Sequence, residues 1–362
     1  MKRMGLAFLI SFILVSQTFG WSAKEHIQLT RIAAMNLMAD PATPQPLKDW
    51  LKKQYPQALN MEGEKDYFLH THIGTTPKGY TGLSWQAIEP DNHAFAEKTQ
   101  LVEPFGVIER TLHFIDLELF IKGDAPRVYK HDLSNKPKAE DIPHDMKDER
   151  WVQAGMLPFA VEYSYKQLVK SIREDRLDET PESKNDNAVR WAGYLAHYAE
   201  DNTQPLHATI DYQCETYFAN KKKAPKVHFQ LEYMMADDEK NEHAELRQEF
   251  WPLFEAAVKD AKDPIETNDP WEATIQVSLA SYDAIPMVGL AGMAAAKQAG
   301  TPDHPTGPSS EFSTEVFYRF KGELHGKSMT VMQMKADQQG WAVKRVERLF
   351  KQAWEEAGKK PN

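Results

Sequence analysis

Apolar residues recur every three to four positions along most of the chain, and alternating strand patterns are nearly absent. Because this spacing places apolar side chains on one face of a helix, it predicts an all-α protein. We expect helices at 24–38, 106–121, 155–172, 185–201, 226–236, 242–262, 271–296 and 341–357. Two segments are expected to be loops: 74–92, which is rich in Gly, Thr and Pro, and 122–150, which is charged and contains three prolines.

No clear linker divides residues 21–362, so we expect one multi-helix domain in which 122–150 is a loop-rich insertion. Hydrophobic residues make up 41% and charged residues 27% of the chain, which argues against an intrinsically disordered protein. The net charge of −10 argues weakly against binding to long polyanions. The single cysteine, Cys214, cannot form an intrachain disulfide.

The N-terminal segment has the pattern of a secretory signal peptide. Lys2 and Arg3 precede an apolar run over 6–15, and Gly20 provides a small residue before the expected cleavage point. We therefore expect a secreted or periplasmic protein that begins at Trp21; the alternative is a retained membrane anchor. No later segment has about 18 uninterrupted apolar residues, so no transmembrane span is expected in the mature chain.

The strongest local signal is the run from His197 to His207. His197 and Asp201 are four residues apart on a predicted helix, so both side chains project from one face. Gln204 and Pro205 then end the helix and bring His207 back towards it. Two imidazoles and a carboxylate that converge in this way suit zinc, although a solvated aspartate beside two incidental histidines is the alternative.

Two further features add imidazole and carboxylate groups. His228 and Glu232 repeat the four-residue spacing on the next predicted helix. His113 lies among Leu112 and Ile115, so its side chain should point inward. Either feature alone is weak, because helix faces share such residues by chance and inward histidines are often part of the core.

The expected mature N-terminus offers another set of ligands. A free α-amine has a pKa of about 8, so a metal ion can displace its proton easily. The amine and carbonyl oxygen of Trp21 could form a chelate, and His26 could complete the site. The alternative is that Trp21 only packs near the start of the first helix.

These motifs occur together in one order along the chain: Trp21 with His26, then His113-Phe-Ile-Asp116, His197-x3-Asp201-x2-Gln-Pro-Leu-His207 and His228-x3-Glu232. In this the chain resembles the superfamily of zinc-dependent phospholipases C and single-strand-specific zinc nucleases. The resemblance covers residues 21–232 as a string of motifs and is looser in the C-terminal helices. It implies a secreted, all-α enzyme that holds three zinc ions in a helical cleft and hydrolyses phosphate esters.

The resemblance also implies which residues bind metal. The first zinc would take Asp91, His113, His197 and Asp201; the second would take His207, His228 and Glu232; and the third would take the amine and carbonyl of Trp21, His26 and the other oxygen of Asp201. The family places its first aspartate closer to the His113 position than Asp91 is, and Asp66 is the rival. His70, His72 and His93 have no counterpart in the family.

The implied reaction is direct attack on phosphorus by water whose pKa zinc lowers to about 7. Asp201 would bridge two ions, and Asp91 could be a ligand, an orienting group or a base. No stable protein partner is implied.

Two branches of the family differ in substrate. Glu232 and the acidic charge favour a phospholipase C-like phosphodiesterase, which we expect. The Trp21–His26 spacing favours a single-strand-specific nuclease or 3′-nucleotidase, and Phe114 could stack on a base. A zinc-binding interaction protein without catalysis is the alternative from another class.

Overall fold

The computed structural model describes residues 20–74, 79–96, 99–121, 133–218, 225–238, 240–301 and 304–358. Helices dominate this part of the chain, so the all-α prediction is confirmed at the level of fold class. The strands of the described residues form three antiparallel hairpins: β1 (Leu101–Val102) with β2 (Val107–Ile108), β3 (Ala296–Thr301) with β4 (His304–Phe312), and β5 (Lys321–Leu324) with β6 (Lys327–Thr330).

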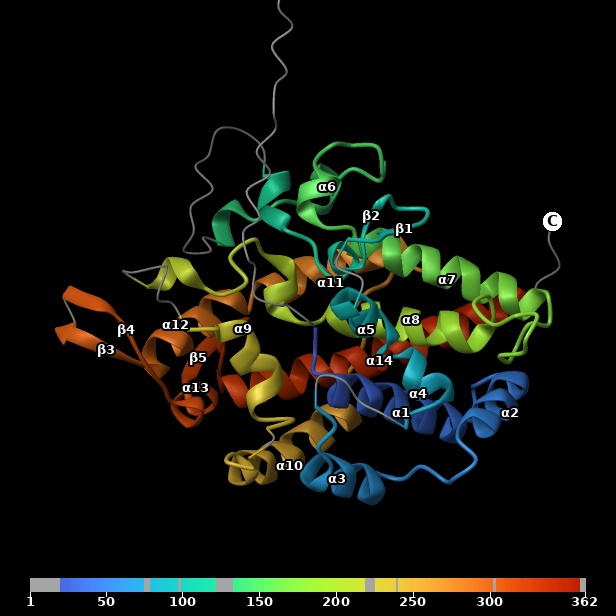
Figure 1. The fold of residues 1–362 in the computed structure, drawn as a ribbon, viewed down its shortest axis with the longest axis horizontal. Helices are drawn as coiled ribbons and strands as arrows, with labels where there is room; N and C mark the ends of the chain where they lie inside the picture. The colour runs from blue at the N-terminus through green and yellow to red at the C-terminus, as the bar shows by residue number, and fades with distance from the viewer. Residues whose placement is uncertain are drawn as a thin grey trace, which may run out of the picture.

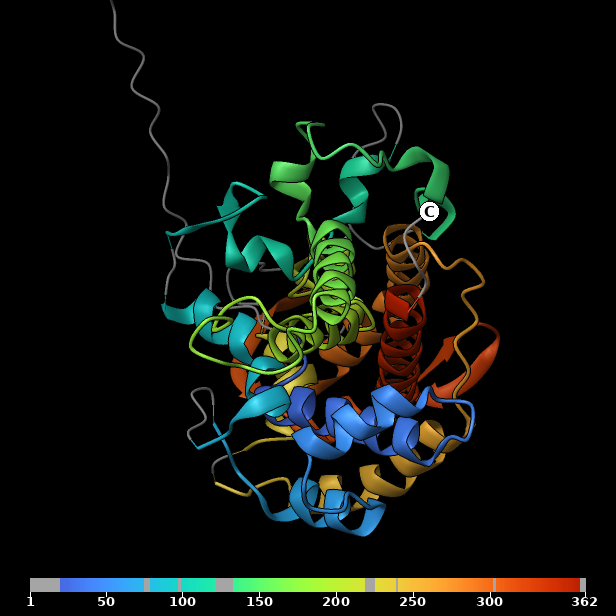
Figure 2. The same ribbon diagram turned by 90° about the vertical axis from the view of Figure 1, so that its right-hand side faces the viewer.

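The longest helix of the described residues, α14 (Val331–Gly358), runs through the middle of the molecule (Figures 1 and 2). It packs against α1 (Ala23–Ala39), α7 (Leu157–Arg173), α8 (Ala188–Asp201) and α10 (Ala244–Asp260). All five helices contribute buried side chains to one apolar cluster. This cluster holds α1 and α8 in fixed positions, and both helices carry predicted metal ligands.

The remaining elements surround this group. The helices are α2 (Gln45–Gln54), α3 (Met61–His70), α4 (Gly82–Gln86), α5 (Glu89–Ala96), α6 (Trp151–Ala154), α9 (Val227–Phe229), α11 (Pro270–Tyr282), α12 (Ile285–Ala295) and α13 (Thr314–Arg319). Short 3₁₀ turns are η1 (Glu109–Leu112), η2 (Leu117–Phe120), η3 (Leu133–Asn135), η4 (Ala139–Asp141), η5 (Pro205–Ala208) and η6 (Glu215–Tyr217), and η8 (Gln230–Met234) is a π-helix.

Most of the long predicted helices are present. The predictions at 24–38, 155–172, 185–201 and 242–262 correspond to α1, α7, α8 and α10, and 341–357 lies within α14. The segment 226–236 is α9 followed by η8, and 271–296 contains two helices, α11 and α12.

The helix expected at 106–121 is wrong. This segment contains β2, η1 and η2, and no continuous helix. The backbone N–H of Ile115 donates to the His207 carbonyl at 2.8 Å, and that of Asp116 donates to the Ala154 carbonyl at 2.6 Å. Because these groups bond to distant segments, they cannot make the i to i−4 bonds of an α-helix.

The loop expected at 74–92 is also wrong over much of its described part, where α4 and the start of α5 lie. Helix α4 packs closely on α8 at Gly193, where an added Cβ would lie 2.3 Å from the Gln86 Cβ. Packing against α8 therefore accompanies helix formation in a Gly- and Pro-containing stretch that local composition alone marks as a loop.

In the segment 122–150, residues 122–132 lie outside the described residues, as does most of the expected signal peptide. The remainder, 133–150, contains only the short turns η3 and η4, in agreement with the expected loop.

By length and composition alone, one helical stretch among the described residues, Pro270–Ala295, could cross a membrane. Its most apolar window is 61% buried inside the fold, and the stretch is divided into α11 and α12. Both features are those of helices that pack in a protein core.

Candidate metal centre

The eight side chains expected to bind metal are all buried and lie in three groups, two of which share His197. The groups are His26 with Asp91 and His197, His113 with His197 and Asp201, and His207 with His228 and Glu232; the ligand atoms within each group lie within 4.8 Å of one another. Residues from α1, α5, α8, α9 and the segments around η1, η5 and η8 thus meet at one place. Such groups could bind metal ions.

Asp201, the last residue of α8, lies between two sets of histidines. Its Oδ2 is 2.9 Å from His113 Nδ1 and 3.3 Å from His197 Nε2, whereas its Oδ1 is 3.2 Å from His26 Nε2. Burial alone would raise the pKa of Asp201, but the imidazoles of His197 and His207 and the hydrogen bond to His113 hold it well below its usual value. The two carboxylate oxygens therefore face different histidines, as a bridging ligand requires.

Asp91 lies at this cluster, and its rival does not. Asp91 Oδ1 is 3.7 Å from His197 Nε2 and 3.8 Å from His113 Nδ1. The Asp66 side chain is 79% exposed, and its nearest basic partner is His70, at 3.9 Å. Asp66 thus takes no part in the cluster.

The group around Glu232 forms the other end of the centre. Its Oε1 lies 3.5 Å from His207 Nε2, contacts His228 Nε2, and accepts a hydrogen bond of 2.5 Å from Gln204 Nε2. Burial raises the pKa of Glu232 well above the usual value for a glutamate. It lowers the pKa of His228 well below the usual value for a histidine. Both shifts reflect the cost of charge in a dry site, and a bound cation would offset that cost for the carboxylate.

Several buried polar atoms at the centre have no hydrogen-bond partner among the described residues. They are His26 Nε2, Asp91 Oδ1, His113 Nε2, Asp201 Oδ1 and both ring nitrogens of His228. Buried polar groups are nearly always paired, so a cluster of unpaired ones requires an explanation. Metal ions held by these atoms would supply it, and imidazole and carboxylate donors in this mixture suit zinc.

The opposite nitrogens of three histidines are held by groups outside the cluster. His197 Nδ1 lies 2.8 Å from the Ala87 carbonyl, His207 Nδ1 lies 2.6 Å from the His113 carbonyl, and His26 Nδ1 lies 2.6 Å from Glu200 Oε2. Metal-binding histidines are commonly oriented in this way, which leaves the other nitrogen free for the ion.

Sequence reasoning missed these outer partners. Glu200 precedes Asp201 in the strongest motif, but its pairing with His26 depends on how α1 packs against α8. Thr30 also donates to Glu200 at 2.9 Å, and burial raises the pKa of Glu200 to about 7. No local signal marks this pairing, because Glu200 and His26 lie 174 residues apart in the chain.

The segment before His26 lies against Asp201. The Trp21 indole is buried and donates to the Glu200 carbonyl at 3.0 Å. A Cβ built on Gly20 would lie 1.3 Å from Asp201 Oδ1, so only glycine fits there. The Gly20–Trp21 peptide is therefore next to the atoms expected to form the third site.

A capping box fixes where α1 begins. The Ser22 side chain accepts from the Glu25 backbone, and the Glu25 carboxylate accepts from Ser22. Lys335 of α14 donates to Glu25 at 2.7 Å, and its ammonium lies 5.2 Å from the centroid of the Trp21 ring. These contacts hold Trp21 and His26 at the centre.

The histidines without a family counterpart lie outside the three groups. His72 Nδ1 is 2.5 Å from Asp237, and His93 Nε2 is 3.1 Å from Glu89. Phe114 is half-buried, and its backbone and ring approach Gly155 so closely that a Cβ there would clash with both.

No family model matches this chain, and no curated protein matches it. Its function must therefore be argued from the motifs and from the geometry of this centre.

Proposed function

We propose that the protein is a zinc-dependent hydrolase of phosphoric esters. The observation that carries this proposal is Asp201, whose two oxygens face separate sets of histidines at 2.9–3.3 Å in a fully buried site. Paired metal ions held by a shared carboxylate are typical of enzymes that cleave phosphate esters. All eight expected side-chain ligands lie at this centre, which supports the proposal of a metal-dependent hydrolase.

Each polar residue of the centre has a distinct task in this proposal. Asp201 would supply one carboxylate oxygen to each of two ions, and Glu200 and Gln204 orient His26 and Glu232. Asp91 Oδ1 has no hydrogen-bond partner in the described part of the chain, so it can accept a proton or a hydrogen bond from an attacking water. When bound, zinc would supply Lewis-acid activation of water and neutralise charge on the phosphate.

The proposed site of action is outside the cytoplasm, after cleavage behind Gly20. The contact between Gly20 and Asp201 supports this, because removal of Gly20 would free space beside the carboxylate. It would also turn the Trp21 amide into an amine that can bind metal.

For the substrate, we propose a phospholipid, so that the enzyme is phospholipase C-like. The His228–Glu232 pair supports this choice, because the nuclease branch usually has aspartate at the second position. Single-stranded nucleic acid is the second candidate, and the five-residue spacing from Trp21 to His26 favours it.

A generic substrate tests whether the protein is an enzyme at all. Purified protein that begins at Trp21 should hydrolyse bis(p-nitrophenyl) phosphate, lose this activity with a chelator and regain it with zinc. The exposed, unclustered Asp66 provides a matched control, because Asp66→Asn should leave the rate unchanged whereas Asp91→Asn should reduce it strongly. Zinc binding without hydrolysis would instead favour a non-catalytic interaction protein.

The substrate class needs a second assay. The zinc-loaded protein should be compared on phosphatidylcholine vesicles and on single-stranded DNA. Faster release of phosphocholine supports the phospholipase C-like proposal, and faster cleavage of DNA overturns it in favour of the nuclease.

A further inference from the structure

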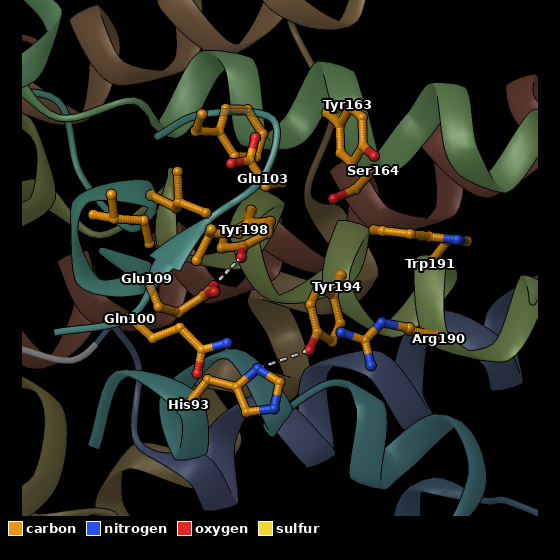
Figure 3. A pocket seen from close by; sticks show the side chains of 14 residues that line it. His93, Gln100, Glu103, Glu109, Tyr163, Ser164, Arg190, Trp191, Tyr194 and Tyr198 are labelled. Carbon is orange, nitrogen blue, oxygen red and sulfur yellow. Dashed lines mark hydrogen bonds between the residues drawn. The ribbon is translucent and has the colours of Figure 1, made fainter. Parts of the chain in front are cut away.

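A cavity of about 340 Å³ lies beside the metal centre, between the β1–β2 hairpin and helices α5, α7 and α8 (Figure 3). Its lining is rich in aromatic side chains, namely Phe105, Tyr163, Trp191, Tyr194 and Tyr198. The volume falls in the range of about 300–1,000 Å³ that is usual for sites of small ligands. The cavity could therefore hold one small molecule.

The aromatic rings meet edge to face and form a corner. The centroid of the Tyr163 ring lies 5.5 Å from that of Trp191, with an interplanar angle of 86°. It lies 5.4 Å from the centroid of the Phe105 ring, with an angle of 78°. Tyr163 and Trp191 are both partly exposed. A planar ligand could stack against rings arranged in this way.

Arg190 lines the same cavity, and the part of the chain that the structure describes offers it no acidic partner. Its guanidinium carbon lies 4.5 Å from the centroid of the Tyr194 ring, and Figure 3 shows the group beside that ring and near Trp191. Among the described residues, Arg190 Nε is buried without a hydrogen-bond partner, and Arg190 forms no ion pair. A buried guanidinium nitrogen needs an acceptor, and phosphate is the anion whose geometry it matches best.

Tyr198 and Glu109 separate the cavity from the metal centre. Their side chains are hydrogen-bonded to each other, and the Tyr198 ring lies 5.6 Å from the rings of both His113 and His197. Both residues are buried. A ligand in the cavity would therefore be one layer of side chains away from the metal ligands and would not contact them.

We propose that this cavity binds a nucleotide, with the base stacked in the aromatic corner and the phosphate on Arg190. Gln100 and Ser164 also line the cavity, and each side chain has both donor and acceptor capacity for the edge of a base. An acyl chain would leave the arginine without an acceptor. A nucleotide satisfies both the rings and the guanidinium.

This inference goes beyond the proposed function, because binding in the cavity requires no hydrolysis. It also supplies a physical reason to include single-stranded nucleic acid among the substrates tested. If the protein binds nucleotide here but hydrolyses no phosphate ester, the proposed function fails and the cavity assignment stands.

Calorimetric titration of the zinc-loaded protein with a non-hydrolysable adenosine phosphonate tests the proposal. We expect binding that weakens about tenfold or more in Arg190→Gln, because a charge-assisted hydrogen bond is lost. Tyr163→Leu should also weaken binding of the phosphonate. The same variant should weaken binding of adenosine, which has the base but no phosphonate. Lys259→Gln, on the exposed surface of α10, is the control of equal charge change and should bind as the native protein does.

A metal-site variant distinguishes the cavity from the metal centre. If His228→Gln abolished phosphonate binding while Arg190→Gln and Tyr163→Leu bound normally, the ligand would lie on the metal ions and the proposal would be overturned. Absence of binding at millimolar phosphonate, or tighter binding of phosphocholine at the cavity, would overturn it as well. Melting temperatures of all variants show whether any loss of binding reflects loss of fold.

Discussion

Two buried polar regions lie close together in this protein, and they differ in how their charges are satisfied. Around Glu25, the Lys335 ammonium faces a carboxylate at 2.7 Å, and Lys24 donates to the carbonyls of Phe68 and Ala236 at 2.5 and 2.8 Å. At the candidate metal centre, Asp91, Asp201 and Glu232 meet five histidines. Among the described residues, no lysine or arginine forms an ion pair with these carboxylates, and several atoms of the centre have no hydrogen-bond partner.

This difference separates a structural ion-pair network from a binding site. Buried charges that have partners on the protein contribute to the fold, and their removal should change stability first. Buried ligands without partners indicate a group that the polypeptide itself does not provide. Substitutions in the two regions should therefore change different measured quantities.

The largest effect is expected at the bridging position. Asp201→Asn should reduce the rate of hydrolysis by at least about 100-fold, because it weakens the binding of two metal ions at once. Loss of a group that only orients a metal ligand already costs about 10–100-fold in metal affinity or activity. Glu232→Asp should be mild by comparison, since it keeps the carboxylate and shortens it. Rates on bis(p-nitrophenyl) phosphate at saturating zinc provide the measurement. Equal losses in the two variants would contradict the bridging role of Asp201.

The second effect concerns the free amine of Trp21. A protein that begins Gly-Trp21 keeps the indole packing but has an amide at that nitrogen, and an amide is a poor donor to zinc. We expect it to bind one zinc fewer and to hydrolyse esters slowly. Equal zinc content and equal rates in the two forms would show that Trp21 only packs against α8.

The third effect lies in the structural network. Lys335→Met should lower the free energy of unfolding by about 3–5 kcal/mol, because it leaves the Glu25 carboxylate buried without a cation, with only the neutral donors Ser22 and Gln339. Its effect on zinc binding should be smaller than that of Asp201→Asn. Denaturant unfolding measures the first quantity. The double variant with Glu25→Gln should regain part of the loss, and no recovery would mean that packing alone is responsible.

The smallest effect is a pH dependence. Burial lowers the pKa of Lys24 from 10.5 to about 8. The unfolded chain therefore binds more protons than the folded chain between these values, so this lysine makes stability rise as pH increases from about 8 to 10.5. Lys24→Met should flatten that rise relative to the native protein. Unfolding at several pH values checks this, and an unchanged slope would show that Lys24 is ordinarily protonated in the fold.

The sequence predicted which polar side chains come together better than it predicted the backbone around them. His197 and Asp201 were predictable because four-residue spacing on a helix brings side chains together whatever the rest of the fold does. The segment carrying His113 was assigned to a helix wrongly, since its backbone bonds to residues far away in the chain. The prediction that the His113 side chain points inward was nevertheless correct, because its neighbours Leu112 and Ile115 are buried although the segment is not a helix.

Other parts of the centre depend on contacts between elements. The choice of Asp91 over Asp66 rested on position in the chain, and only the packing of α5 beside α8 places Asp91 at the histidines. The contact of Ala87 with His197 requires the close approach that Gly193 permits. Such partners have no local signature, because they are brought together by packing.

The zinc content of the chain that begins at Trp21 tests the central claim most directly. Elemental analysis of folded protein, supplied with zinc and then freed of excess metal, should give about three zinc ions per chain, held by the convergent imidazole and carboxylate groups. Chelation should also lower the melting temperature, since metal binding is coupled to folding. One zinc ion or none in a folded sample would contradict the three-metal centre.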